Sequence, residues 1–334
     1  MTATAAPSLL QAVQPFAFDA EVTGIGWLKD TAAFALADGG VGLARGTETH
    51  VSVAHPDGVI LVAASDGERF VTGGDDGRLA VTGSDGSTRT LDEVKGWIDA
   101  LAVHASGSVA YATTKRVVFR DEKGREKAFE APSTVRGLAF APKGTRLALA
   151  HYNGATLWFP NLETKPEVLE WKGSHLDVTW SLDGRFVVTS MQENALHGWR
   201  LQPDRGHMRM SGYPAKTRSM SWSSDGAWLA TSGAEAVIIW PFGSKEGPTG
   251  KPPRECGVRA AKVTRVAFHP TTMIVAAAYE DGCILLIRLN DASELLVRPV
   301  VRGSGVTALA WDVKGRRLAF GCADGQAGVL TLPS

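Results

Sequence analysis

The sequence has no surplus of charge of either sign. Its 334 residues contain 35 Lys and Arg and 35 Asp and Glu, so the formal net charge at pH 7 is zero. A protein that binds nucleic acid over much of its surface needs extra Lys and Arg to contact the phosphates. The balance therefore argues against a general nucleic-acid binder, although it leaves room for a local basic patch.

Long apolar runs, a charged leader and paired cysteines are also missing. No stretch approaches the roughly 18 apolar residues that cross a bilayer, and no Lys or Arg precedes a long apolar run at the N-terminus, as in a secretory signal. The three cysteines, Cys256, Cys283 and Cys322, form no CxxC pair. We expect reduced thiols, no membrane partner and a cytoplasmic location.

What the sequence does have is an internal repeat. An apolar run ends in an anchor residue, usually aromatic, and a glycine follows shortly after it, as in TVRGLAFAPKG at 134–144. The eight anchors are Trp27, Ala63, Val103, Phe140, Trp180, Trp222, Phe268 and Trp311. Neighbouring anchors lie 36 to 46 residues apart. This spacing is typical of a β-propeller blade, which has four strands.

Each unit continues in the same way after its glycine. A second apolar run leads to a tight turn, which is Asx-Gly at Asp76-Gly77, Asn153-Gly154, Asp281-Gly282 and Asp324-Gly325. Asx-Gly between β-rich runs indicates a hairpin, because the turn needs positive φ. A third run and a weaker fourth run follow. The runs are apolar almost throughout, which favours an all-β protein whose sheets are covered on both faces.

With these features the chain resembles the WD40-repeat β-propeller family over roughly residues 15–332. The resemblance rests on the period, the anchor hairpin and the Asx-Gly hairpin. Trp158, Trp199 and Trp240 stand in third strands, but Phe159, Arg200 and Pro241 replace the Asp that follows in the family. The chain therefore resembles a divergent member.

The last unit supplies only three strands before the chain ends. A three-stranded blade would leave unpaired backbone groups at its edge. The segment QPFAFDA at 14–20 precedes the first hairpin and has no other partner. We therefore predict a single closed propeller of eight four-stranded blades over 14–334, with this N-terminal strand completing the last blade. Residues 1–13 are expected to be disordered or extended. Seven blades is the alternative, in which the loose copy near 60 or 98 is not a blade.

No catalytic constellation emerges from the sequence. The eight histidines are scattered without zinc-site spacing. GPTGKPP at 247–253 lacks the first glycine and the Ser or Thr of a phosphate loop. In the middles of the innermost strands, Asp99 and Asp177 are the acidic candidates among small residues. We predict a non-enzyme with no metal and no cofactor. The alternative is a propeller hydrolase or lyase with a divalent cation in its central channel.

The resemblance also implies which residues meet partners. Loops entering the innermost strands share one side of the ring with the turns between second and third strands, and this side, the front face, usually docks other proteins. The predicted partner-binding residues are Trp97, Arg136, Tyr152, Trp171, His175, Tyr213, Lys216, Arg218, Arg259, Lys262 and Tyr279. Aromatic residues with Arg are typical of interface hot spots. The basic members favour an acidic or phosphorylated segment of a protein partner. RNA contact through the same residues is a further alternative.

Overall fold

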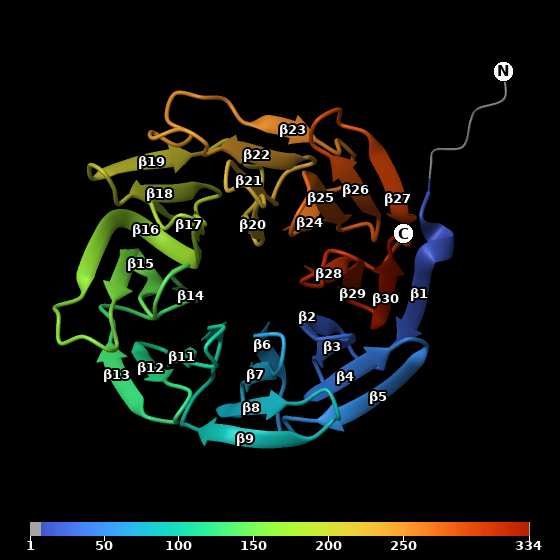
Figure 1. The fold of residues 1–334 in the computed structure, drawn as a ribbon, viewed down its shortest axis with the longest axis horizontal. Coiled ribbons are helices and arrows are strands. Elements are labelled where there is room, and N and C mark those ends of the chain that lie inside the picture. Colours follow the sequence, from blue (N-terminus) through green and yellow to red (C-terminus); the bar gives the residue numbers. More distant parts are fainter. Residues whose placement is uncertain (1–7, 334) are drawn as a thin grey trace.

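The computed structural model describes residues 8–333, and its strands form a ring with no strand at its centre (Figure 1). We call the centre, which the innermost strands surround, the channel. In this part of the chain the strands make seven hydrogen-bonded sheets, six of four strands and one of six. Every pairing between consecutive strands of a sheet is antiparallel, as short hairpin connections require. The all-β propeller architecture is confirmed.

In each of the six four-stranded sheets, the strands follow one another in this order from the innermost to the outermost. In the first half of the chain they are β2 (Val22–Leu28), β3 (Thr31–Leu36), β4 (Gly40–Arg45) and β5 (Glu48–Val53); β6 (Ile60–Ser65), β7 (Phe70–Gly74), β8 (Arg78–Thr82) and β9 (Thr88–Glu93); and β10 (Ala100–Val103), β11 (Val109–Thr113), β12 (Arg116–Arg120) and β13 (Glu126–Glu130). In the second half they are β20 (Met220–Trp222), β21 (Trp228–Thr231), β22 (Val237–Pro241) and β23 (Arg254–Cys256); β24 (Val263–Phe268), β25 (Ile274–Tyr279), β26 (Ile284–Arg288) and β27 (Glu294–Arg298); and β28 (Val306–Trp311), β29 (Arg317–Cys322) and β30 (Gln326–Thr331) with β1 (Val13–Ala17).

The six-stranded sheet changes the predicted count. Its strands are β14 (Gly137–Phe140), β15 (Leu147–Trp158), β16 (Glu167–Trp180), β17 (Phe186–Met191), β18 (Leu196–Arg200) and β19 (Gly206–Met210). The first half of β16 pairs with β15 and its second half with β17, so two hairpin units share one 14-residue strand. Between Glu170 and Ser174, which both pair with β15, the strand passes through Trp171, Lys172 and Gly173, and no proline stops it there.

Eight separate four-stranded blades was therefore the wrong prediction, because seven sheets form. The alternative of seven gave the right number for the wrong reason. It required one loose copy near 60 or 98 not to be a blade, yet β6–β9 and β10–β13 are both complete four-stranded sheets. The number falls because of the shared strand β16.

The two ends of the chain close the ring, as predicted. β1 lies beside β30 (Figure 1), and the two pair antiparallel from Val13 with Leu330 to Ala17 with Gln326. A 3-10 helix, η1 (Leu10–Ala12), precedes β1, and the Leu9 N–H donates to the Leu296 carbonyl oxygen of β27 at 2.7 Å. The predicted tail of residues 1–13 thus contains η1 and the first residue of β1, while its residues 1–7 lie outside the described part.

Anchor tryptophans join neighbouring units around the channel. The indole Nε1 of Trp180 donates to the Ala139 carbonyl oxygen at 3.2 Å, and that of Trp311 donates to the Ala267 carbonyl oxygen at 3.1 Å. Trp222 makes the same kind of contact with Thr179 Oγ1 at 3.0 Å. These anchors act as packing residues that also satisfy their one polar group.

Small residues line the innermost strands because the strands converge there. A Cβ added to Gly137 would stand 2.6 Å from the Cα of Asp177 in the neighbouring unit, and one added to Gly24 would stand 3.1 Å from the Ala63 Cβ. Side chains of ordinary size cannot fit between backbones this close. The small residues that sequence analysis placed near the channel thus have a packing role.

The Asx-Gly turns form as the sequence predicts. Gly77, Gly282 and Gly325 have φ of 78°, 87° and 81°, and Asn153 itself has φ of 66°. The first of these turns carries a hydrogen-bonded histidine. The ring of His55 contacts Asp76 at 3.0 Å through Nδ1 and Thr72 Oγ1 at 2.8 Å through Nε2.

Candidate functional site

A basic hollow on the front face brings together three of the predicted partner-binding residues. It encloses about 420 Å³, where the innermost strands β2, β20, β24 and β28 begin. Lys216, Arg218 and Lys262 line it, and so does Arg265, which sequence analysis did not select. Glu21 and Glu280 supply its carboxylates.

Local hydrogen bonds hold the loop that carries Arg218. The N–H groups of Arg218 and Ser219 both donate to Ser232 Oγ at 3.1 Å, and Thr217 Oγ1 donates to the Ser232 carbonyl oxygen at 3.0 Å. Ser232, in the β21–β22 turn, therefore accepts the hydrogen bonds that fix the backbone just before β20. The exposed Arg218 side chain starts from a fixed backbone.

A β-bulge places Arg265 in the channel wall. The pairing of β24 with β25 shifts register between Val263 and Arg265, and bulges redirect side chains in this way. The same shift occurs in β16 between His175 and Asp177. Arg265 and Asp177 thus occupy equivalent positions, each three residues before its anchor, and this spacing is the signal by which Arg265 could have been found.

The charges of the hollow are incompletely balanced. Lys262 Nζ lies 3.9 Å from Glu280 Oε1. Within residues 8–333, no carboxylate lies within 4.0 Å of a Lys216, Arg218 or Arg265 nitrogen. Burial lowers the pKa of Arg265, and the positive charge of Arg218 lowers it further, while Glu21 and Asp177 act in the opposite direction. The hollow is therefore a site of net positive potential.

The two carboxylates predicted near the channel have separate surroundings. Asp99 Oδ2 accepts a hydrogen bond from Arg136 Nη1 at 2.5 Å. Burial in the channel wall raises the pKa of Asp177 to about 6, against the hydrogen bond from the Val178 N–H and the charge of Arg265. Among the described residues, no three His, Cys, Asp or Glu side chains gather as metal ligands would.

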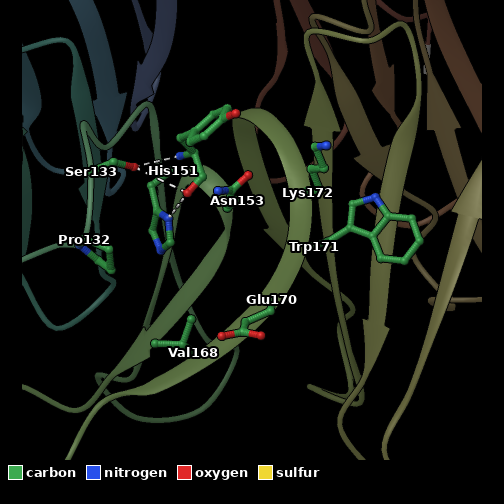
Figure 2. A pocket seen from close by; sticks show the side chains of 9 residues that line it. Pro132, Ser133, His151, Asn153, Val168, Glu170, Trp171 and Lys172 are labelled. Atoms are coloured by element: carbon green, nitrogen blue, oxygen red, sulfur yellow. Dashed lines mark hydrogen bonds between the residues drawn. The ribbon is translucent and has the colours of Figure 1, made fainter.

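A second hollow on the front face lies beside Tyr152 and encloses about 780 Å³ (Figure 2). We call it the Tyr152 hollow; its lining is Pro132, Ser133, His151, Tyr152, Asn153, Val168, Glu170, Trp171 and Lys172. The Tyr152 side chain is 55% exposed, and its backbone N–H donates to Ser133 Oγ at 2.9 Å. Tyr152 is therefore available to a partner from a fixed backbone.

Trp171, another predicted partner-binding residue, borders the Tyr152 hollow but turns its indole away from His151. In Figure 2 its indole lies on the other side of the β16 ribbon from His151. There it stacks on His197, with ring centroids 3.9 Å apart and an interplanar angle of 16°. Trp97, by contrast, is 62% exposed in the loop before β10.

Three predicted partner-binding residues are corrected because they are buried. His175 contacts Thr189 Oγ1 at 2.7 Å and the Trp171 carbonyl oxygen at 3.0 Å. Tyr213 accepts a hydrogen bond from Trp240 Nε1 at 2.6 Å, and Tyr279 donates to the Gly257 carbonyl oxygen at 2.5 Å. All three side chains complete hydrogen bonds within the fold, so they cannot reach a partner.

Two of the predicted arginines are already neutralised. Arg136 pairs with Asp99 as described above. Arg259 lies 3.4 Å from Asp281 Oδ2, and its guanidinium lies over the Tyr279 ring at 5.3 Å from the centroid. These pairs reduce the charge that either arginine offers to a partner.

A buried histidine, His197, lies against the Trp171 indole and had no signal in the sequence. His197 is fully buried, and neither of its ring nitrogens has a hydrogen-bond partner among the described residues. Burial, together with His207, His175 and Arg209, lowers the pKa of His197 to about 3. The imidazole is therefore neutral and serves as a flat packing surface.

Comparisons with known proteins agree with this architecture. A family model described as the anaphase-promoting complex subunit 4 WD40 domain matches residues 259–333. The computationally designed Ika8 protein superimposes with a TM-score of 0.77 at 17% identity, covering 95% of this chain and 98% of that chain. The C-terminal WD40 domain of Sif2 gives a TM-score of 0.77 at 13% identity, covering 99% and 100%.

The curated relatives that match are much longer proteins than this chain. Protein HIR1 of Cryptococcus neoformans is 24% identical over 226 residues, which are 57% of this chain and 25% of that protein. Protein HIR1 of Mycosarcoma maydis is 24% identical over 191 residues, which are 48% and 18%. The chain spans a quarter or less of these relatives. The predicted WD40-like β-propeller is confirmed as a fold.

Proposed function

We propose that this chain is a non-enzymatic scaffold that binds a protein partner through its front face. The observation that carries the proposal is the basic hollow, where Lys216, Arg218 and Arg265 lie together without paired carboxylates. A partly desolvated site of one sign of charge attracts a ligand of the opposite sign. The partner segment is therefore acidic or phosphorylated.

Two exposed aromatic side chains lie on the same face, in other units of the ring. Trp97 and Tyr152 stand on front-face loops of neighbouring units, and large amphipathic rings are common anchors at interfaces. No helix in residues 8–333 is long and apolar enough to span a membrane. Cys256, Cys283 and Cys322 are buried free thiols, which suits the cytoplasmic location that we propose.

No specific observation favours either alternative, a channel enzyme or RNA contact. A channel enzyme would need converging groups, whereas Asp99 is held by Arg136, and Asp177 accepts the hydrogen bond of Val178. RNA would bind in the same hollow. Affinity purification distinguishes the two, because it shows whether RNA or a protein is retained.

Affinity purification with mass spectrometry tests the proposal. The wild-type chain is compared with Lys216→Glu/Arg218→Glu, which reverses charge on the front face. The matched control, Lys143→Glu/Lys314→Glu, makes the same charge change in exposed hairpin turns of the opposite, back face. We expect the front-face variant to lose the partner at unchanged melting temperature and the control to keep it. Equal recovery by all three chains would refute the front-face assignment.

A further inference from the structure

We infer that the basic hollow binds a phosphate monoester carried by the partner, with Arg218 and Arg265 as its main ligands. This inference rests on the proposed function and names the chemical group that the front face recognises. It singles out Arg265, which lies at the end of a bulge in the channel wall.

The first argument is the contrast between arginines on one face. The guanidinium groups of Arg136 and Arg259 each have an aspartate oxygen within 3.4 Å. Arg218 and Arg265 share a hollow, and the structure gives neither a carboxylate within 4.0 Å in residues 8–333. Burial is the main cause of the lowered pKa of Arg265, and repulsion by Arg218 adds to it, while the more distant Glu21 and Asp177 offset only part of the effect. An anionic ligand would relieve this repulsion.

The second argument is the amount of charge. Lys216, Arg218, Lys262 and Arg265 line the hollow with four positive charges, and Glu21 and Glu280 contribute two negative charges. The difference is two positive charges. A phosphate monoester carries about −1.5 to −2 at neutral pH, whereas a carboxylate carries one negative charge. The phosphate therefore matches the hollow better than an acidic side chain does.

The third argument is geometry. Arg265 Nη1 donates to the Thr264 carbonyl oxygen at 3.0 Å, which fixes the guanidinium, and its other N–H groups have no hydrogen-bond partner in residues 8–333. Guanidinium groups bind phosphate oxygens through paired N–H donors, which a lysine cannot reproduce. The hollow, at about 420 Å³, has room for a phosphorylated side chain but opens on the front face, so a protein segment can deliver it.

Calorimetric titration tests this with defined probes. The probes are the capped peptides Gly-Gly-pSer-Gly-Gly and Gly-Gly-Glu-Gly-Gly, and inorganic phosphate. We expect the phosphopeptide to bind at least about tenfold more tightly than the glutamate peptide, a difference of about 1.4 kcal/mol. Inorganic phosphate should compete for the site. Equal affinity for the two peptides, or no heat from the phosphopeptide, would overturn the inference.

Variants assign the ligands. Arg218→Ala, at an exposed side chain, and Arg265→Lys, which keeps the charge but removes the paired donors, should each weaken phosphopeptide binding about tenfold or more. Lys143→Ala and Lys314→Ala are the controls, because both lysines lie in exposed turns of the back face, and they should change phosphopeptide binding less than about twofold. If the controls weaken binding as much as Arg218→Ala does, the hollow is not the phosphate site.

A second readout separates this inference from the proposed function. The lysate used for affinity purification is divided, and one half is treated with phosphatase. Loss of the partner from the treated half supports the phosphate site. A partner that is retained after treatment but lost from Lys216→Glu/Arg218→Glu contradicts the phosphate and leaves the scaffold standing. If neither half yields a partner that depends on the front face, the proposed function fails as well.

Discussion

The indole Nε1 of Trp27 donates a hydrogen bond of 3.1 Å to the carbonyl oxygen of Ala310, a residue 283 positions away in the chain. Trp27 anchors the first hairpin unit and Ala310 lies in β28 of the last. Beside them, Thr307 Oγ1 donates to the Val22 carbonyl oxygen at 2.6 Å. The junction of the two chain ends therefore uses the same tryptophan contact as the junctions inside the chain.

Removal of residues 1–20 should open the ring. The deletion takes away β1, leaves the edge of β30 unpaired and exposes the apolar residues that Phe18 covers near Phe34. We expect the melting temperature, followed by circular dichroism, to fall strongly. A synthetic peptide of residues 8–20 added in excess should restore part of the loss. A truncated chain that melts cooperatively at the parent temperature would disprove this closure.

The anchor tryptophans should differ in their contribution to stability according to burial. Trp180 is buried, so Trp180→Ala should lower the free energy of unfolding by about 3–5 kcal/mol. Trp222 is only partly buried, so Trp222→Ala should cost less than that. Urea denaturation measures both values. A larger loss at Trp222 than at Trp180 would mean that packing is not what these anchors provide.

His197 should make the fold sensitive to acid. Its pKa of about 3 in the folded chain lies below the usual 6.5, so the unfolded chain binds a proton that the folded chain does not. Above about pH 6.5 His197 is neutral in both states and costs no stability. As the pH falls from 6.5 toward 3, protonation of His197 in the unfolded chain lowers the free energy of unfolding.

His197→Leu, an apolar replacement of similar volume, should flatten that dependence. The measurement is the urea midpoint of both chains from pH 7 down to pH 4. Parallel curves for the variant and the wild type would show that His197 does not titrate in this way. Because only the change with pH is compared, a packing cost of the substitution does not affect the result.

Asp177 should have the opposite effect. Its pKa in the folded chain is about 6, above the usual value of 3.8, so between these pH values the folded chain holds a proton that the unfolded chain releases. The carboxylate therefore destabilises the fold increasingly as the pH rises from about 4 to 6, and fully above that. Asp177→Asn keeps an oxygen for the Val178 N–H and should be more stable than the wild type at pH 8, with the difference shrinking toward pH 4.

The sequence predicts the ring well because its signals are local. Asx-Gly turns and anchor residues act within one hairpin, and the unpaired last unit indicated the role of residues 14–20. The shared strand β16 could not be predicted from the same rules. Whether Lys172, Gly173 and Ser174 form a turn or stay extended depends on the strands that pair on both sides of them.

The candidate site was harder to predict for a different reason. Position on a loop indicates that a residue lies on the front face, but not whether its side chain points outward. His175, Tyr213 and Tyr279 turn inward to complete hydrogen bonds, and Arg259 is paired with Asp281. Arg265 was missed because it lies inside a strand, where only the bulge brings it to the hollow.

Hydrogen–deuterium exchange of the chain with its purified partner tests most directly whether the front face does the binding. We predict that the partner slows exchange in the loop at 213–219, which carries Arg218, and in the segment 259–266, where the start of β24 carries Arg265. The back-face turns at 142–146 and 312–316 should be unchanged. Protection of the back-face turns with no change in the two front-face segments would contradict the account.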